Sequence, residues 1–242
     1  MEIVTTSEHL DLKKAAAKAL RQDWPEFVLH DPISNLHRAA AERYFPDYDV
    51  LLVEDGAVLA NAAAVALRWD GEVATLPDGY DGALVTAVAQ HEESVEPDTL
   101  CVMAATVLPG RTGAGLAGKV LTALRERAAD AGLRKVIVPV RPTLKSRYPL
   151  TPMRDFMGWT RDDGLHLDPW IRTHQRLGAA VLASAPRSMV VPGTVAEWER
   201  WTGMAFPQSG SYVVPGALDL VEIDRERGTG RYEETNLWMR HS

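Results

Sequence analysis

The sequence contains a single cysteine, Cys101, so it can form neither an internal disulfide nor a cysteine-rich zinc site. It has no apolar run of membrane-spanning length, and the N-terminus lacks a basic region followed by an apolar core. Compactly spaced histidine and carboxylate ligands are also missing, although His30 and His37 lie near one another. We therefore expect a cytoplasmic protein with no bound metal and no membrane partner.

Positive charge is also scarce. The formal net charge is −7 and the sequence pI is about 5.5, which argues against a nucleic-acid partner because binding to phosphate backbones calls for a basic face. The 242 residues are 46% hydrophobic, enough for a packed core. We expect one domain spanning residues 1–242.

Hydrophobic patterning predicts a mixed α/β fold. Two helices, Leu10–Gln22 and Ser34–Tyr44, precede an antiparallel pair of strands joined at Glu54-Asp55-Gly56, since Asp-Gly between apolar runs indicates a hairpin. A surface helix is expected over Gly82–Glu93. The strand Asp98–Leu108, a glycine-rich loop, an amphipathic helix from Leu116 and the strand Lys135–Val140 then form a parallel crossover.

The glycine-rich segment Val107–Lys119 is the most informative part of the chain. Its glycines let the backbone approach a ligand, and the first turn of the following helix offers free N–H groups to a phosphate. Residues 113–118 also spell the dinucleotide fingerprint G-x-G-x-x-G. A dinucleotide fold would open with this loop and end the next strand in a carboxylate, whereas here two helices and a hairpin come first and Arg141 follows the strand. A nicotinamide-dependent oxidoreductase is therefore the remote alternative.

This order of elements resembles the GNAT acyltransferase superfamily over about the first two thirds of the chain. The family's loop reads Gln/Arg-x-x-Gly-x-Gly/Ala, and Gly115 and Ala117 match it, while Thr112 replaces the usual Gln or Arg and Arg111 lies one place earlier. The run from residue 163 to residue 218 also resembles a longer bacterial subgroup, some of whose members act in specialised metabolism.

The resemblance implies a GNAT-like mixed sheet with antiparallel N-terminal strands, the parallel crossover at the glycine loop and an extended C-terminal β elaboration at 186–242. It also implies acetyl-CoA or another acyl-CoA as co-substrate. The loop amides would bind its pyrophosphate, and the preceding strand would pair with its pantetheine arm. The implied cofactor-binding residues are Thr106, Val107, Leu108, Arg111, Thr112, Gly113, Ala114, Gly115, Leu116, Ala117 and Gly118.

Two residues are candidates for the acid that protonates the departing thiolate. The segment ending in Gly178-Ala179 resembles the family's Tyr-x-x-x-Gly-Phe pattern and places His174 at the tyrosine position. Imidazole titrates near neutrality, so His174 is the first candidate, with a surface or capping role as the alternative. Tyr148 is the reserve candidate.

The acceptor site is expected to draw on an insertion at 141–167, where Arg141 and Lys145 would offer positive charge to a carboxylated acceptor. A solvated loop is the alternative. His30 and Asp31 would face the acceptor beside the first helices, with helix capping by Asp31-Pro32 as the alternative.

Together these features predict transfer of an acyl group, most simply acetyl, from acyl-CoA to the amine of a small molecule by direct attack. The alternatives are transfer from the pantetheine of an acyl carrier protein and a non-catalytic acyl-CoA-binding module. A homodimer is a further partner to test. The acyl chain and the acceptor are not specified by the sequence.

Overall fold

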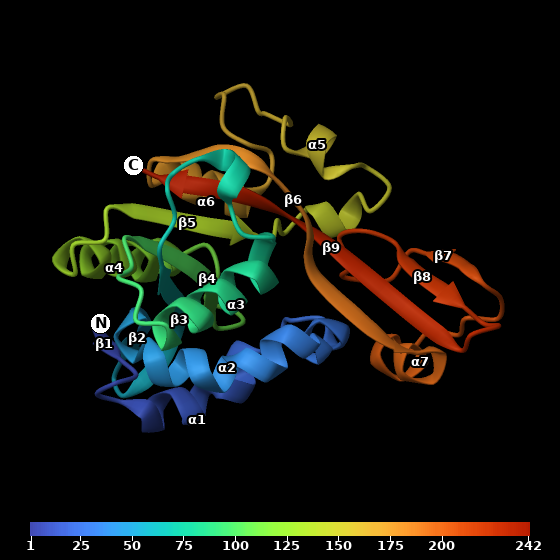
Figure 1. Cartoon of the computed structure of the whole chain (residues 1–242), viewed down its shortest axis with the longest axis horizontal. Helices are drawn as coiled ribbons and strands as arrows, with labels where there is room; N and C mark the ends of the chain where they lie inside the picture. The colour runs from blue at the N-terminus through green and yellow to red at the C-terminus, as the bar shows by residue number, and fades with distance from the viewer.

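A computed structural model describes residues 1–242, and a mixed sheet of nine strands forms its centre (Figure 1). The strand order is β1-β2-β3-β4-β5-β9-β8-β7, with β6 paired to β9 outside this path. The strands are β1 (Glu2–Thr5), β2 (Asp49–Glu54), β3 (Ala57–Leu67), β4 (Thr99–Val107), β5 (Lys135–Val140), β6 (Ala179–Thr194), β7 (Gly210–Tyr212), β8 (Val221–Asp224) and β9 (Thr229–His241). Every pair is antiparallel except β4 with β5, which confirms the predicted fold class.

The helices connect and cover these strands. The α-helices are α1 (Leu10–Leu20), α2 (Pro32–Tyr44), α3 (Gly79–Glu92), α4 (Leu116–Asp130), α5 (Met153–Phe156), α6 (Pro169–Arg176) and α7 (Val195–Thr202). Short 3-10 helices are η1 (Glu26–His30), η2 (Pro46–Tyr48), η3 (Val73–Thr75) and η4 (Lys145–Arg147). No helix combines the length and the apolar character needed to span a membrane.

The N-terminal half follows its sequence signals closely. Asp55 and Gly56 both have positive φ, 51° and 77°, as a tight hairpin between β2 and β3 requires. The alternation of β2 then separates two faces: Leu51 and Val53 pack toward α1, whereas Leu52 belongs to the main core. The predicted antiparallel hairpin is confirmed.

Helix α3 differs from the prediction of a surface helix over Gly82–Glu93. It starts at Gly79, and Ala83, Leu84 and Ala87 are fully or almost fully buried. Gly79 has φ +62°, and a Cβ there would lie 2.2 Å from the Ser188 hydroxyl oxygen. This close approach lets α3 pack between α2 and β6, so its small apolar face is internal.

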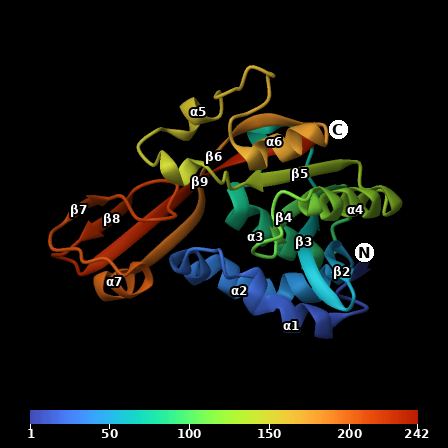
Figure 2. The ribbon, with the colours of Figure 1, turned by 180° about the vertical axis from the view of Figure 1, so that it is seen from behind.

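Strands β6 and β9 form a long ribbon that joins two packed cores (Figures 1 and 2). Near the C-terminus β9 lies between β5 and β6, and its first half lies between β6 and β8. The ribbon bends where the β6 register shifts after Ala185, and Arg187 adopts φ +56° there. The second core gathers around Trp198 and Tyr232 beneath the far half of the ribbon.

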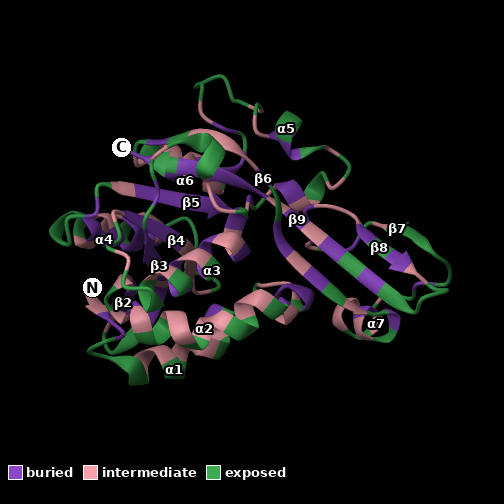
Figure 3. Cartoon of the chain, viewed as in Figure 1, coloured by how far each residue is buried: buried purple, intermediate pink, exposed green.

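Figure 3 shows how burial follows this division: the strands of the main sheet are largely buried, and the outer faces of α1 and α2 are exposed. The predicted C-terminal strands do extend the sheet. Strand β9, however, is internal, because it pairs with β5 as well as with β6.

Candidate active site

Strands β4 and β5 pair only at their beginnings. Thr99–Cys101 is in register with Lys135–Ile137, and beyond that point the two parallel strands separate. A bulge at Met103, where the register of β4 with β3 shifts, adds local twist. The β4 edge from residue 102 to residue 107 therefore keeps backbone N–H and C=O groups without a strand partner, as an extended ligand requires.

The glycine loop leads directly from this edge into α4. Gly113 and Gly115 have φ +84° and +73°, and Gly115 is the N-cap of α4 in a left-handed conformation without a side-chain cap. The first-turn N–H groups of α4 thus remain available to an anion. A Cβ added at Gly118 would meet no atom within 4 Å, so the loop leaves open space beside these amides.

One cavity of about 850 Å³ joins the loop, the unpaired edge and the region between the two cores. Nine of the predicted cofactor residues line it: Thr106, Val107, Arg111, Thr112, Gly113, Gly115, Leu116, Ala117 and Gly118. Leu108 and Ala114 do not. The Leu108 N–H instead bonds to the Leu59 carbonyl, and its side chain packs on the small core beneath α1.

A buried polar network borders this cavity where β5 ends. Arg141 Nε donates to Glu234 Oε2 at 2.9 Å, and a terminal nitrogen donates to the Gly216 carbonyl at 2.7 Å. Tyr232 donates to Glu234 Oε2 and Asn236 to Oε1. Burial is the largest single influence on the Arg141 pKa and lowers it, but Glu234 and Tyr232 together outweigh burial and raise the guanidinium pKa. Because residues 232, 234 and 236 alternate along β9, all three point to the same side.

A second polar group lies where α3 meets β6. The Tyr80 N–H donates to Ser188 Oγ, which donates to Asn236 Oδ1 at 2.6 Å. Burial raises the pKa of the Tyr80 phenol, so it stays protonated, and Tyr80 lines the cavity. Asp81 accepts from the Val190 N–H, and its pKa is raised by burial and then by Asp31.

His174 does not line the cavity. Its ring is completely buried and its Nδ1 lies 3.0 Å from His241 Nε2. Burial lowers its pKa to about 3, so the imidazole is neutral at physiological pH. Helix α6 turns its Trp170 and Thr173 face to the cavity and buries Ile171 and His174 on another face. The predicted acid role of His174 therefore has no support in this placement, because α6 presents Trp170 and Thr173 to the cavity where His174 was expected.

Tyr148, the reserve acid, also lies outside the cavity. It is 39% exposed and packs edge-on against Trp159, with ring centroids 4.8 Å apart. Its neighbour Lys145 is fully buried, donates to the Tyr148 and Leu218 carbonyls, and lies 3.6 Å from Asp219. These bonds hold the insertion onto the segment that leads into β8, and they bury Lys145 away from the cavity.

Of the remaining acceptor residues, only Arg141 lines the cavity. Asp31 caps α2 by accepting from the Ile33 and Ser34 N–H groups, so its capping alternative is correct. His30 stacks on Trp201 at 4.3 Å and pairs with Glu26, which assigns it to the second core's surface.

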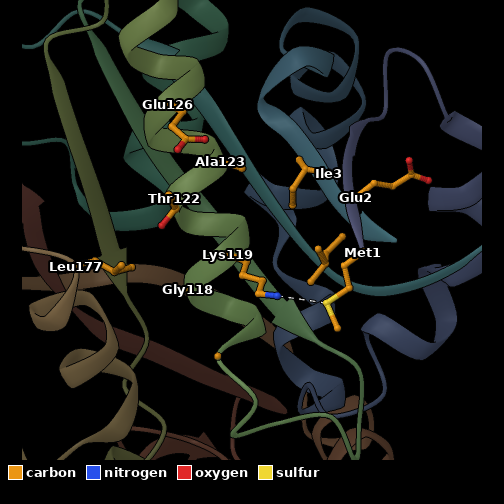
Figure 4. A pocket seen from close by; sticks show the side chains of 11 residues that line it. Met1, Glu2, Ile3, Gly118, Lys119, Thr122, Ala123, Glu126 and Leu177 are labelled. Carbon is orange, nitrogen blue, oxygen red and sulfur yellow. Dashed lines mark hydrogen bonds between the residues drawn. The ribbon is translucent and has the colours of Figure 1, made fainter. Parts of the chain in front are cut away.

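A smaller cavity of about 450 Å³ lies beside the same helix (Figure 4). It is bordered by the N-terminal residues and by Gly118, Lys119, Thr122 and Glu126 of α4. Lys119 points toward Met1, at 3.4 Å from its sulfur. In the whole structure, no group of three or more His, Cys, Asp or Glu side chains is arranged to hold a metal ion.

Several cavity residues carry no motif that would identify them in the sequence. Tyr80 follows a glycine in an unremarkable helix, and Ser34 and Arg38 lie on the polar side of α2. Glu234 and Asn236 do leave one signal: they are two polar residues at spacing two directly before the apolar run Leu237-Trp238-Met239, which places both on one face of a strand.

The split strands, the bulge and the glycine loop are the features of the GNAT acyltransferase fold, which this chain shares with the proteins below. No family model matches the chain. The arginine N-acetyltransferase avaD of Aspergillus versicolor is 28% identical over 245 residues, which cover 90% of this chain and 84% of that protein.

Two solved structures share the fold over the full chain. The loading GNATL domain of CurA from Lyngbya majuscula superposes with a TM-score of 0.62 at 15% identity, covering 100% of this chain and 96% of that one. The GphF GNAT-like decarboxylase in complex with isobutyryl-CoA gives 0.58 at 16% identity, with coverages of 100% and 99%. Membership of a longer bacterial subgroup stays a prediction.

Proposed function

We propose that this chain is an acyl-CoA-dependent N-acyltransferase that moves an acyl group, most simply acetyl, to the amine of a small molecule. One observation carries the proposal: the α4 N-terminus, the unpaired β4 edge and the buried Arg141–Glu234 network all border the same cavity. The relative from Aspergillus versicolor is named for N-acetylation of arginine, and the GphF structure contains an acyl-CoA.

The chain's own groups fit the parts of acyl-CoA. The amides at residues 113–118 would bind the pyrophosphate, and Arg111, exposed and without a carboxylate partner, would add charge there. The β4 edge would hydrogen-bond the pantetheine amides as an added strand would. The bulge at Met103 lies where the strands part, which is where the thioester would sit.

In the reaction, the amine nitrogen attacks the thioester carbonyl carbon. The C–N bond forms, the C–S bond breaks, and the proton lost by nitrogen ends on the thiolate sulfur. Unpaired β4 amides can stabilise the charge that develops on the carbonyl oxygen. Tyr80 brings a protonated phenol to the cavity and is our candidate to pass the proton to sulfur.

The test begins with calorimetric titration of acetyl-CoA, CoA, NADH and NADPH into the parent chain and into Gly118→Glu. That substitution adds a carboxylate beside the loop amides where no atom lies within 4 Å, so it should fold and weaken acetyl-CoA binding at least tenfold. The control is Ala129→Glu at an exposed position near the other end of α4. Binding of a nicotinamide cofactor alone would contradict the proposal.

Turnover is then measured as thiol release from acetyl-CoA in the presence of small amines, with the acylated product identified by mass. Acetyl-pantetheine presented on a carrier protein is run beside acetyl-CoA to compare the two donors. Tight acetyl-CoA binding without turnover on either donor would favour a binding module over an enzyme.

A further inference from the structure

The cavity ends in a chamber between the two cores, which we call the junction chamber. Its apolar wall is formed by residues that belong to η1, to the segment before it and to β6: Trp24, Val28, Leu29 and Met189. Its polar wall is formed by Ser34, Arg38, Tyr80, Arg141, Glu234 and Asn236. The chamber therefore suits a compact ligand with one apolar part and one polar part.

The single carboxylate of this wall is already saturated. Glu234 is fully buried, Oε1 accepts from Asn236, and Oε2 accepts from both Arg141 and Tyr232. Its charge is used to hold Arg141 in place. Asp31 and Asp81 lie nearby, but neither borders the cavity; Asp31 is committed to the α2 N-terminus and Asp81 to the Val190 N–H. Asp23, Glu42 and Asp49 border the same cavity outside this polar wall; Asp23 is exposed, and Glu42 and Asp49 pair with Lys13. No carboxylate of the polar wall itself is thus open to a cationic ligand.

The two arginines of the polar wall, Arg141 and Arg38, differ from Glu234 because each still has N–H donors that are not used within the protein. An arginine has five N–H donors, and Arg141 uses two of them on Glu234 and Gly216. Tyr232 also interacts with the guanidinium of Arg141. The Arg141 side chain is 21% exposed and borders the cavity, so some of its N–H donors remain free to bind a ligand. Arg38 has no carboxylate partner and bonds only to Asn35 within α2. With Glu234 balancing Arg141, the charged groups of the polar wall carry one net positive charge, on Arg38.

We propose that Arg141 and Arg38 bind a carboxylate on the acceptor, so that the acceptor class is amines carrying a carboxylate, such as free amino acids. A planar guanidinium fixed by a buried carboxylate matches carboxylate geometry and selects against the neutral amide. The inference rests on the proposed N-acyltransferase function and specifies the substrate that the junction chamber accepts.

The experiment compares matched acceptors in the thiol-release assay: L-arginine against L-argininamide, and L-tryptophan against L-tryptophanamide. We expect kcat/KM at least tenfold higher for the acid than for its amide in whichever pair is acylated. Equal or faster transfer to the amide would overturn the carboxylate assignment and leave the acyltransferase proposal standing. Absence of transfer and of calorimetric binding for all four compounds would overturn the assignment, while acetyl-CoA titration decides the proposed function separately.

Variants test the two arginines. Replacing Arg141 alone would leave Glu234 buried without its partner, so the pair is changed together as R141Q/E234Q, which keeps a neutral hydrogen-bonded pair. Arg38→Gln lies on the partly exposed face of α2, and Arg43→Gln is its control on the same helix outside the cavity. We expect KM for the acid to rise at least tenfold in R141Q/E234Q and severalfold in Arg38→Gln. KM for acetyl-CoA and for the amide should not change, and an equal rise for acid and amide would contradict the assignment.

Discussion

His174 Nδ1 lies 3.0 Å from His241 Nε2, and the other nitrogen of each ring is buried without a hydrogen-bond partner. One ring must donate to the other, so the contact requires at least one neutral imidazole. Burial and, to a smaller extent, the nearby His241 lower the pKa of His174 to about 3. Burial and, to a smaller extent, the charge of Arg125 lower the pKa of His241 to about 4. The pair is therefore a structural contact, and protonation of either buried ring destabilises the folded protein.

This pair predicts loss of stability in acid. The unfolded chain binds protons below about pH 6.5, whereas the folded chain resists protonation until about pH 4 and then pH 3. The free energy of unfolding should fall as pH drops below 6.5, by up to about 1.4 kcal/mol per pH unit for each histidine. Urea unfolding between pH 7 and pH 4.5 measures the slope. His174→Leu should reduce it, whereas the exposed control His9→Gln should not.

Asp81 predicts the opposite trend, a loss of stability as pH rises from about 4 to about 8. Burial raises the pKa of this carboxyl, and the nearby Asp31 raises it further. The folded chain therefore holds a proton that the unfolded chain has released above about pH 4, so this contribution to stability falls as pH rises toward the folded pKa. Asp81→Asn should raise the melting temperature at pH 8.5 more than at pH 6. If Asp81→Asn destabilised the protein equally at pH 6 and pH 8.5, Asp81 would be ionised in the folded protein at both pH values.

Gly230 predicts a steric limit in the second core. A Cβ at this position would lie 2.2 Å from Trp198 Cδ1 and 2.9 Å from Ile223 Cδ1. Gly230→Ala should lower the free energy of unfolding by about 1–3 kcal/mol because both neighbours must move. Gly118→Ala is the comparison, since its Cβ meets no atom within 4 Å. A Gly230→Ala protein as stable as the parent would mean that this core packs more loosely than described.

Tyr80 and Thr173 provide a test of the proton path. Both border the cavity, but Thr173 Oγ1 already donates to the Pro169 carbonyl within α6. Tyr80→Phe should lower kcat about ten- to a hundredfold without changing KM for acetyl-CoA, in line with loss of a general acid. Thr173→Val, the control, should change kcat less than threefold. If His174→Leu lowers kcat as strongly as Tyr80→Phe while binding persists, the original assignment of His174 regains support.

The sequence predicted those parts of the fold and site that depend on local signals. The Asp55-Gly56 hairpin, the glycine loop and the α4 face follow from turn chemistry and helical spacing, and each is where it was expected. The resemblance to the GNAT fold followed from the order of these elements.

The remaining site residues depend on contacts that local signals do not specify. The rotation of α6 is determined by which side Ile171 buries, and the position of Tyr80 depends on Gly79 resting against Ser188 some 109 residues later in the sequence. Arg141 was predicted, but its partner Glu234 comes from β9, whose position beside β5 no periodicity indicates. Tertiary packing decided these positions.

Strand β9 follows the eight other strands of this sheet in the sequence, yet it lies between β5 and β6. Until residues 229–241 arrive, β5 has an unpaired edge, Arg141 lacks Glu234, and the second core lacks Tyr232. Contacts this distant in sequence are slow to form, so an incomplete chain would expose its apolar strands to other chains. The polar wall of the junction chamber and the closure of the sheet thus depend on the same strand, so they form at the same step of folding.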